Sequence, residues 1–147
     1  MSSDQPRCAN LAAELGKRWG LKPLFTPALR EMHFGEWEGR HYDDIDRDDR
    51  TRWRHWCEHW ETASPPGGES LPALTQRITD WLSDNAPFTN TAVVTHAGVI
   101  RTLHGISGLP WSEAMASTWP LAMPLEGRVA SKFPFPPGPR ELNLANP

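Results

Sequence analysis

Apolar residues recur at spacings of three and four along much of the chain, which is the period of an amphipathic helix. Residue types typical of helix ends accompany this pattern. Asp4 is expected to cap the first helix, Gly20 to end it, and Ser70 to cap the third. The predicted helices span residues 6–19, 43–61 and 70–82. A fourth begins at residue 97 and is ended by Gly-Leu-Pro at 108–110, and a short fifth spans 111–118.

Each of the first three helices has an apolar face that predicts its buried side. The expected inward residues are Leu11, Ala12, Leu15 and Trp19, then Trp53, Trp56 and Trp60, then Leu71, Leu74, Ile78, Trp81 and Leu82. The tryptophan face has two interpretations. It packs as core or as a lid over a site, or it forms an aromatic platform for a ring-bearing substrate.

Other apolar runs lack a helical period. Residues 92–95 predict a short buried strand, because they are apolar or β-branched without alternation. Residues 24–27 predict a short extended piece between prolines, and residues 123–133 predict a final strand. Residues 134–147 are rich in proline and predict a flexible tail. The expected organisation is therefore one domain over 1–133 followed by a tail over 134–147.

The segment Thr95-His96-Ala97-Gly98 joins the predicted strand at 92–95 to the helix that follows it. Open α/β sheets bind ligands at the carboxyl ends of their strands, where His96 falls. The free amides of the next helix, Ala97 first, favour a phosphate or a carboxylate at the same point. The alternative is a hydrogen-bonded structural histidine. Phosphate chemistry is the first hypothesis.

A second segment, residues 29–39, combines three carboxylates and two glycines with aromatic rings, which predicts a shaped loop. Glu31 lies beside Met32 and Phe34, and partial burial there suits a general acid that holds its proton near neutral pH. Glu36 and Glu38 are better explained as solvated surface charges.

Composition narrows the possible partners. The 147 residues are 38% hydrophobic with a formal net charge of −3, which is ordinary for one globular domain. The basic residues are scattered, so we expect no nucleic acid partner, and no run approaches a membrane span. Two cysteines and a polar start favour a cytoplasmic location. His55 and His59 have metal-ligand spacing but no obvious third ligand, so we expect no metal and no cofactor.

Four ordered blocks of sequence resemble the histidine phosphatase superfamily, the phosphoglycerate mutase-like group, and within it the small bacterial phosphatases of the α-ribazole phosphatase type. The blocks are Ser2-Ser3 with Arg7-Cys8, Leu29 to Gly39, Pro66 to Ser70, and Thr95 to Arg101; a weaker fifth is Pro124 to Val129. The resemblance implies an α/β class protein with three α/β/α layers and a mostly parallel sheet.

The resemblance also implies a reaction in two steps, in which a histidine attacks phosphorus and water then releases phosphate. In that scheme Arg7 grips phosphate, Glu31 protonates the leaving oxygen, and His96 with the Ala97 amide stabilises the transferring phosphoryl group. The expected partner is a phosphorylated small molecule, such as α-ribazole phosphate, or inorganic phosphate.

The family's first strand carries an Arg-His-Gly motif with the attacking histidine, and this sequence contains no Arg-His-Gly. We therefore expect the fold to lack the family's first strand and helix, and this chain alone to be weakly active or inactive. The strand at 92–95 would lose its neighbour, so a neighbouring strand closes up, a second copy pairs there, or the fold is marginal. The alternatives to a phosphatase are a non-catalytic phosphate-binding protein and an oligomeric interaction protein that uses this sheet edge.

Overall fold

The computed structural model describes residues 1–86 and 88–116. Its strands are β1 (Ser2–Ser3) and β2 (Phe25–Thr26), with short 3-10 turns at Pro27–Leu29 and Gly35–Trp37. Its helices are α1 (Pro6–Trp19), α2 (Tyr42–Asp48), α3 (Arg50–Glu58), α4 (Leu71–Asn85), α5 (Ala97–Ile106) and α6 (Trp111–Ala116). The strand predicted at 123–133 and the tail at 134–147 lie outside the described residues.

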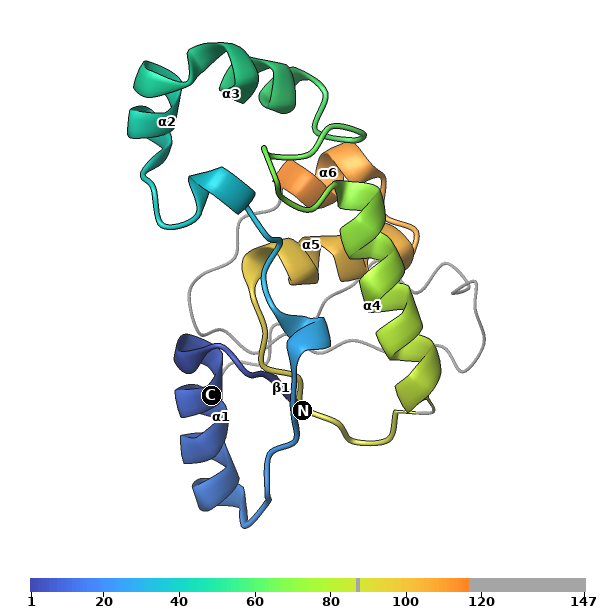
Figure 1. Cartoon of the computed structure of the whole chain (residues 1–147). Helices are drawn as coiled ribbons and strands as arrows, with labels where there is room; N and C mark the ends of the chain where they lie inside the picture. Colours follow the sequence, from blue (N-terminus) through green and yellow to red (C-terminus); the bar gives the residue numbers. More distant parts are fainter. Residues whose placement is uncertain (87, 117–147) are drawn as a thin grey trace.

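The strands form a small parallel sheet with α1 on one side and α4 on the other (Figure 1). β1 pairs with β2 and also makes a parallel bridge from Ser2 to Val94. The amide of Ser3 donates to the Val94 carbonyl at 2.9 Å, and the Val94 amide donates to the Met1 carbonyl at 3.0 Å. The first residues of the chain therefore pair with the segment before His96. This matches the expectation that a neighbouring strand closes up.

The prediction of a buried strand over residues 92–95 is wrong. Among the described residues the segment makes a single bridge at Val94, Ala92 is exposed and Val93 is 36% exposed. An apolar, β-branched strand is buried only where other elements cover both faces of its sheet. No described element covers Ala92 and Val93.

The core lies between α4 and α5, and it confirms the sequence pattern most closely. Leu29, Leu74, Ile78, Trp81, Leu82 and Val99 form one buried cluster. All five inward residues predicted for α4 are buried, and the hydroxyl of Ser70 accepts a hydrogen bond from the Ala73 amide at 3.3 Å. The α4 face therefore fixes where the loop containing Leu29 and the start of α5 meet.

The first helix differs from its prediction in cap and face. Gln5, not Asp4, is its N-cap, because both carboxylate oxygens of Asp4 accept hydrogen bonds from Arg30 at 2.7 and 2.6 Å. Gly20 ends the helix in the left-handed conformation, as expected. The buried row is Cys8, Ala12 and Gly16, whereas Leu11 and Trp19 are 41% and 52% exposed. At Gly16 this row faces the segment after the helix, because a Cβ there would lie 2.6 Å from the Leu21 carbonyl oxygen and 2.9 Å from Pro23.

One helix predicted over residues 43–61 is two helices. Asp49 adopts a non-helical conformation between α2 and α3, where its carboxylate accepts a hydrogen bond from the indole of Trp37 at 2.8 Å. Trp37 is buried at 2% exposure and makes edge-to-face contacts with Trp53 and Trp56. α3 ends at Glu58, so Trp60 lies beyond it. Trp53 and Trp56 thus pack around a tryptophan of the preceding loop, which favours the packing interpretation.

Candidate functional site

Arg7 and His96, which are 89 residues apart, meet where α1 and α5 begin. Pro at the first position starts α1, and Arg7 lies in its first turn. His96 is the N-cap residue of α5 and is 5% exposed. The Nε of Arg7 donates a hydrogen bond to Nδ1 of His96 at 3.0 Å. The sequence predicted both residues for one site, and the structure brings them into direct contact.

The hydrogen bonds of His96 fix its tautomer. Because Nδ1 accepts from Arg7, the neutral ring carries its proton on Nε2, which donates to the hydroxyl of Ser3 at 2.9 Å. That hydroxyl also accepts from the backbone amide of Gln5 at 3.2 Å. β1 therefore orients the ring from one side and α1 from the other.

Burial, followed by the positive charges of Arg7 and Arg77, lowers the pKa of His96 from 6.5 to about 4. The ring is thus neutral at pH 7. A neutral imidazole next to a guanidinium is a hydrogen-bonding group whose charge an incoming anion can change. This is an electropositive site at which the arginine carries the charge.

The thiol of Cys8 lies against the same ring, with its Sγ 3.4 Å from Nε2 of His96. Burial raises the pKa of the Cys8 thiol, so it stays protonated at neutral pH. Its hydrogen points to the Thr95 carbonyl, at a sulfur to oxygen distance of 3.5 Å. Cys8 follows Arg7 in the first block of the resemblance, and this position was the only sequence signal for it, because its spacing from other residues predicts no role.

Glu31 reaches the site from the loop after β2. Its Oε2 accepts a hydrogen bond from the amide of Gly98, the second residue of α5, at 3.3 Å, and its Oε1 accepts from the Met32 amide at 3.0 Å. A carboxylate therefore occupies one of the free amides at the start of α5, as the dipole of the helix favours. Ala97, the first residue of α5, is exposed beside it.

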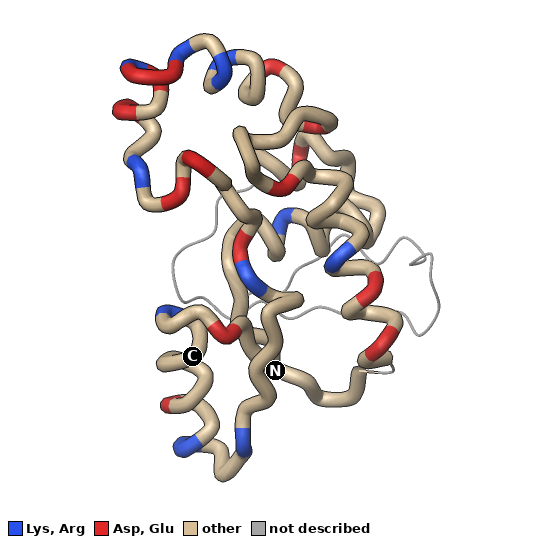
Figure 2. Tube along the Cα trace, viewed as in Figure 1, with Lys and Arg blue, Asp and Glu red and all other residues tan. Residues whose placement is uncertain are grey.

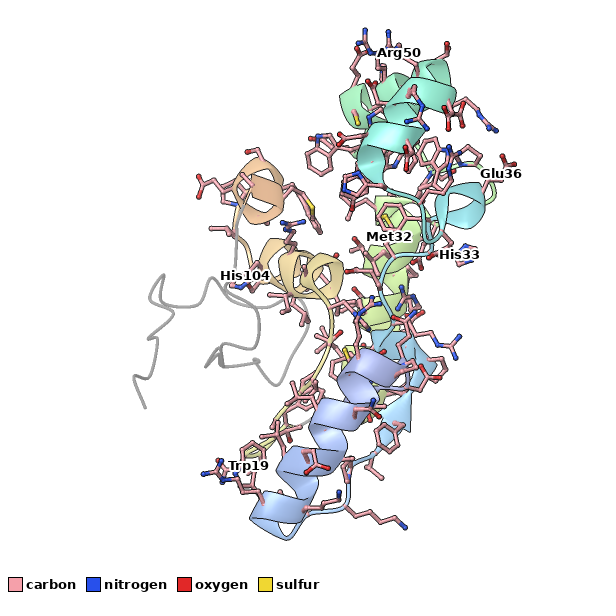
Figure 3. The ribbon with its side chains drawn as sticks, turned by 90° about the vertical axis from the view of Figure 1, so that its left-hand side faces the viewer. Trp19, Met32, His33, Glu36, Arg50 and His104 are labelled. Carbon is pink, nitrogen blue, oxygen red and sulfur yellow. The ribbon has the colours of Figure 1, made fainter. Side chains whose placement is uncertain are left out.

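Glu31 is half-buried, and the residues around it point in different directions. Met32 packs against the core cluster, while His33 is exposed and points away from the molecule (Figure 3). Glu36 and Glu38 are exposed, in agreement with their interpretation as surface charges. The four predicted site residues, Arg7, Glu31, His96 and Ala97, thus converge on the start of α5.

Glu31 also lines a cleft of about 460 Å³. Its wall includes His33, Glu38, Glu69 and Arg77 besides Glu31. Arg77 and Glu69 form an ion pair at 2.7 Å. In the sequence Glu69 stood only within the block Pro66 to Ser70, without a role of its own. Arg77 was not predicted, because an arginine on an amphipathic helix has the pattern of any solvated residue.

Charges elsewhere are mixed. Lys and Arg alternate with Asp and Glu over the described chain, most densely on α2 and α3, where they pair with one another (Figure 2). No helix within residues 1–86 and 88–116 has the length and apolarity that crossing a membrane requires. In the same part of the chain, no three His, Cys, Asp or Glu side chains gather closely enough to hold a metal ion.

Comparison with known proteins places this geometry in a family. The sequence profile of the histidine phosphatase superfamily (branch 1) matches residues 1–122. The chain is 39% identical over 93 residues to an adenosylcobalamin/alpha-ribazole phosphatase of Escherichia coli, and this alignment covers 60% of this chain and 45% of the relative. It is 31% identical over 113 residues to a glucosyl-3-phosphoglycerate phosphatase of Mycobacterium tuberculosis, covering 70% and 51%. The chain thus spans about half the length of the curated relatives it matches.

Solved structures agree with the sequence comparison. An alpha-ribazole-5'-P phosphatase structure from Escherichia coli aligns with a TM-score of 0.67 at 29% identity, covering 78% of this chain and 58% of that one. A mycobacterial glucosyl-3-phosphoglycerate phosphatase in complex with inorganic phosphate aligns with a TM-score of 0.62 at 31% identity, covering 78% and 61%. The α/β, phosphoglycerate mutase-like fold class is confirmed. The chain belongs to the histidine phosphatase superfamily, branch 1.

Proposed function

We propose that the start of α5 binds the phosphate of a phosphomonoester. Arg7 supplies the charge and planar N–H donors, and the leading amides of α5, Ala97 first, supply further donors. Among the described residues, only Nε of Arg7 is engaged, in its bond to His96, which leaves its terminal nitrogens for phosphate oxygens. The observation that carries the proposal is the 3.0 Å contact between Arg7 and His96 at a helix start whose second amide already holds a carboxylate.

Glu31 has the position required of a general acid. Its carboxyl accepts from the Gly98 amide at the start of α5, where we propose that phosphate binds, and Glu31 also lines the cleft that would hold the alcohol part of the ester. A proton delivered from Glu31 to the bridging oxygen lets the alcohol leave neutral. The names of the relatives support a phosphomonoesterase, and α-ribazole phosphate is the substrate we propose. His96 and the α5 amides stabilise the charge on the transferring phosphoryl group.

Inorganic phosphate is expected to protect the protein against heat. A ligand that binds only the folded state at about 100 times its dissociation constant adds about 2.7 kcal/mol to the free energy of unfolding. Arg7→Ala should abolish this protection. Arg47→Ala is the control, because Arg47 is an exposed arginine of α2 paired with Asp44 and Asp48. Equal phosphate-induced shifts in melting temperature for wild type and Arg7→Ala would refute the proposed site.

We expect these 147 residues to bind phosphate but to hydrolyse a phosphomonoester only weakly. No Arg-His-Gly occurs in the sequence, and nucleophilic attack needs a group placed within fractions of an ångström of a productive geometry. Phosphate release from an aryl phosphate should therefore be weak. A substantial rate that His96→Ala removes, with an acid-labile phosphohistidine trapped on another residue, would contradict this expectation.

A further inference from the structure

The guanidinium of Arg77 holds the backbone of the loop that carries Glu31. Arg77 lies halfway along α4, and its Nη1 donates to the carbonyl oxygens of Ala28 at 2.6 Å and Arg30 at 3.0 Å. Its Nη2 lies 3.5 Å from the carbonyl oxygen of Glu31 itself. One side chain therefore contacts three carbonyls within four residues of sequence. The planar fork of arginine makes this possible, because its donors point in fixed directions.

Glu69 fixes the orientation of that guanidinium. Nε and Nη2 of Arg77 donate to the two carboxylate oxygens of Glu69 at 2.9 and 2.7 Å, which is the bidentate geometry of a strong ion pair. The side chains are only 25% and 16% exposed. The backbone of Glu69 also pairs with His33, whose carbonyl accepts from the Glu69 amide at 2.7 Å. The pair thus ties the loop to the start of α4 on both sides of Met32.

The side-chain carboxylate of Glu31 is held by a different element from its backbone. The backbone carbonyl oxygen of Glu31 faces Arg77 on α4, whereas the side-chain Oε2 accepts from the Gly98 amide on α5. A side chain whose backbone can shift does not keep a 3.3 Å contact to one particular amide. The position of the carboxyl therefore depends on where α4 holds the loop.

We propose that Arg77 is a positioning residue for Glu31, with Glu69 setting the direction of its guanidinium. The proposal rests on the proposed function, because it gives Arg77 a part in placing the general acid beside the phosphate. Loss of the fork frees the loop, and the Glu31 carboxylate then leaves the start of α5. Phosphate gains the amide that the carboxylate had occupied.

A double-mutant cycle on phosphate affinity tests this dependence. Glu31→Gln should tighten phosphate binding about threefold to tenfold, because it removes a negative charge from a helix start. Arg77→Lys keeps the charge but lacks the fork, and it should tighten binding by a similar factor. In the Glu31→Gln background, Arg77→Lys should change the affinity by less than twofold. An equal effect of Arg77→Lys in both backgrounds, or no effect in either, would overturn the proposal.

The Gly98 amide gives a second readout that needs no phosphate. Its proton and nitrogen chemical shifts should move in the same direction in Glu31→Gln, Arg77→Lys and Glu69→Gln, since the first change removes the negative charge beside this amide and the other two release the carboxylate. Arg47→Lys on α2 is the matched control and should leave them unchanged. Unmoved Gly98 shifts in folded Arg77→Lys and Glu69→Gln would refute the positioning role. Moved shifts without any phosphate binding would uphold it and refute the proposed function instead.

Discussion

Replacing Gly35 by alanine is expected to lower the free energy of unfolding by about 2 to 4 kcal/mol. Gly35 has a φ of +58°, and a Cβ there would overlap the carbonyl oxygen of Pro66 and lie 2.6 Å from backbone atoms of Gly67 and Gly68. The left-handed conformation costs an alanine about 1 kcal/mol. Crowding against backbone that cannot rotate away adds about 1 to 3 kcal/mol. Chemical denaturation measures the loss.

Gly39→Ala separates the two causes. Gly39 has a φ of +72° in the same loop, but a Cβ there meets no atom within 4 Å. Its replacement should cost only the conformational part, about 1 kcal/mol. The excess cost at Gly35 then measures how tightly the loop carrying Glu31 is docked on the turn before α4. Equal costs at the two positions would show that this docking is loose.

Acid is expected to destabilise the protein well above the range where carboxylates titrate. The pKa of His96 is about 4 in the folded protein, compared with 6.5 for an unperturbed histidine. The unfolded chain therefore binds a proton at this residue between pH 6.5 and about 4, while the folded chain does not. The stability that the neutral ring contributes is fully present above pH 6.5 and is lost as the pH falls to about 4. The loss is about 3 kcal/mol.

His96→Gln is the control for this pH dependence. Between pH 6.5 and 4 the free energy of unfolding of His96→Gln should fall by about 3 kcal/mol less than that of the wild type. Burial also lowers the pKa of His104, but that residue contributes to both proteins and cancels in the comparison. Parallel pH profiles for wild type and His96→Gln would show that His96 titrates normally.

The sequence predicted those features that local pattern alone decides. The period of α4 gave all five of its buried residues, and Ser70 gave its start, because a helix face and a cap depend on residues within one or two turns. The placement of Arg7 and His96 in one site came from the resemblance of motifs in order along the chain, and the structure joins the two by a hydrogen bond. The structure brings the two residues together because α1 follows β1 and α5 follows the segment paired with β1.

Long-range polar contacts escaped prediction, since side-chain partners far apart in sequence leave no local pattern. Asp4 resembled a helix cap but pairs with Arg30, and Asp49 interrupted a predicted helix because Trp37 donates to it. The fork from Arg77 to three carbonyls depends on the loop lying across α4. The burial of residues 92–95 was wrong for a related reason: strand composition does not say which faces another element covers. Oligomerisation through that edge stays a prediction.

The titration of the His96 ring with and without phosphate tests the central claim most directly. Carbon-detected or proton–carbon NMR of the imidazole should give a pKa near 4 in the free protein. Saturating phosphate should raise it, because an anion bound beside Arg7 favours the charged ring, and Arg7→Ala should remove the response. Superimposable titration curves in wild type, with and without phosphate, would contradict an oxyanion site built from Arg7, His96 and the start of α5.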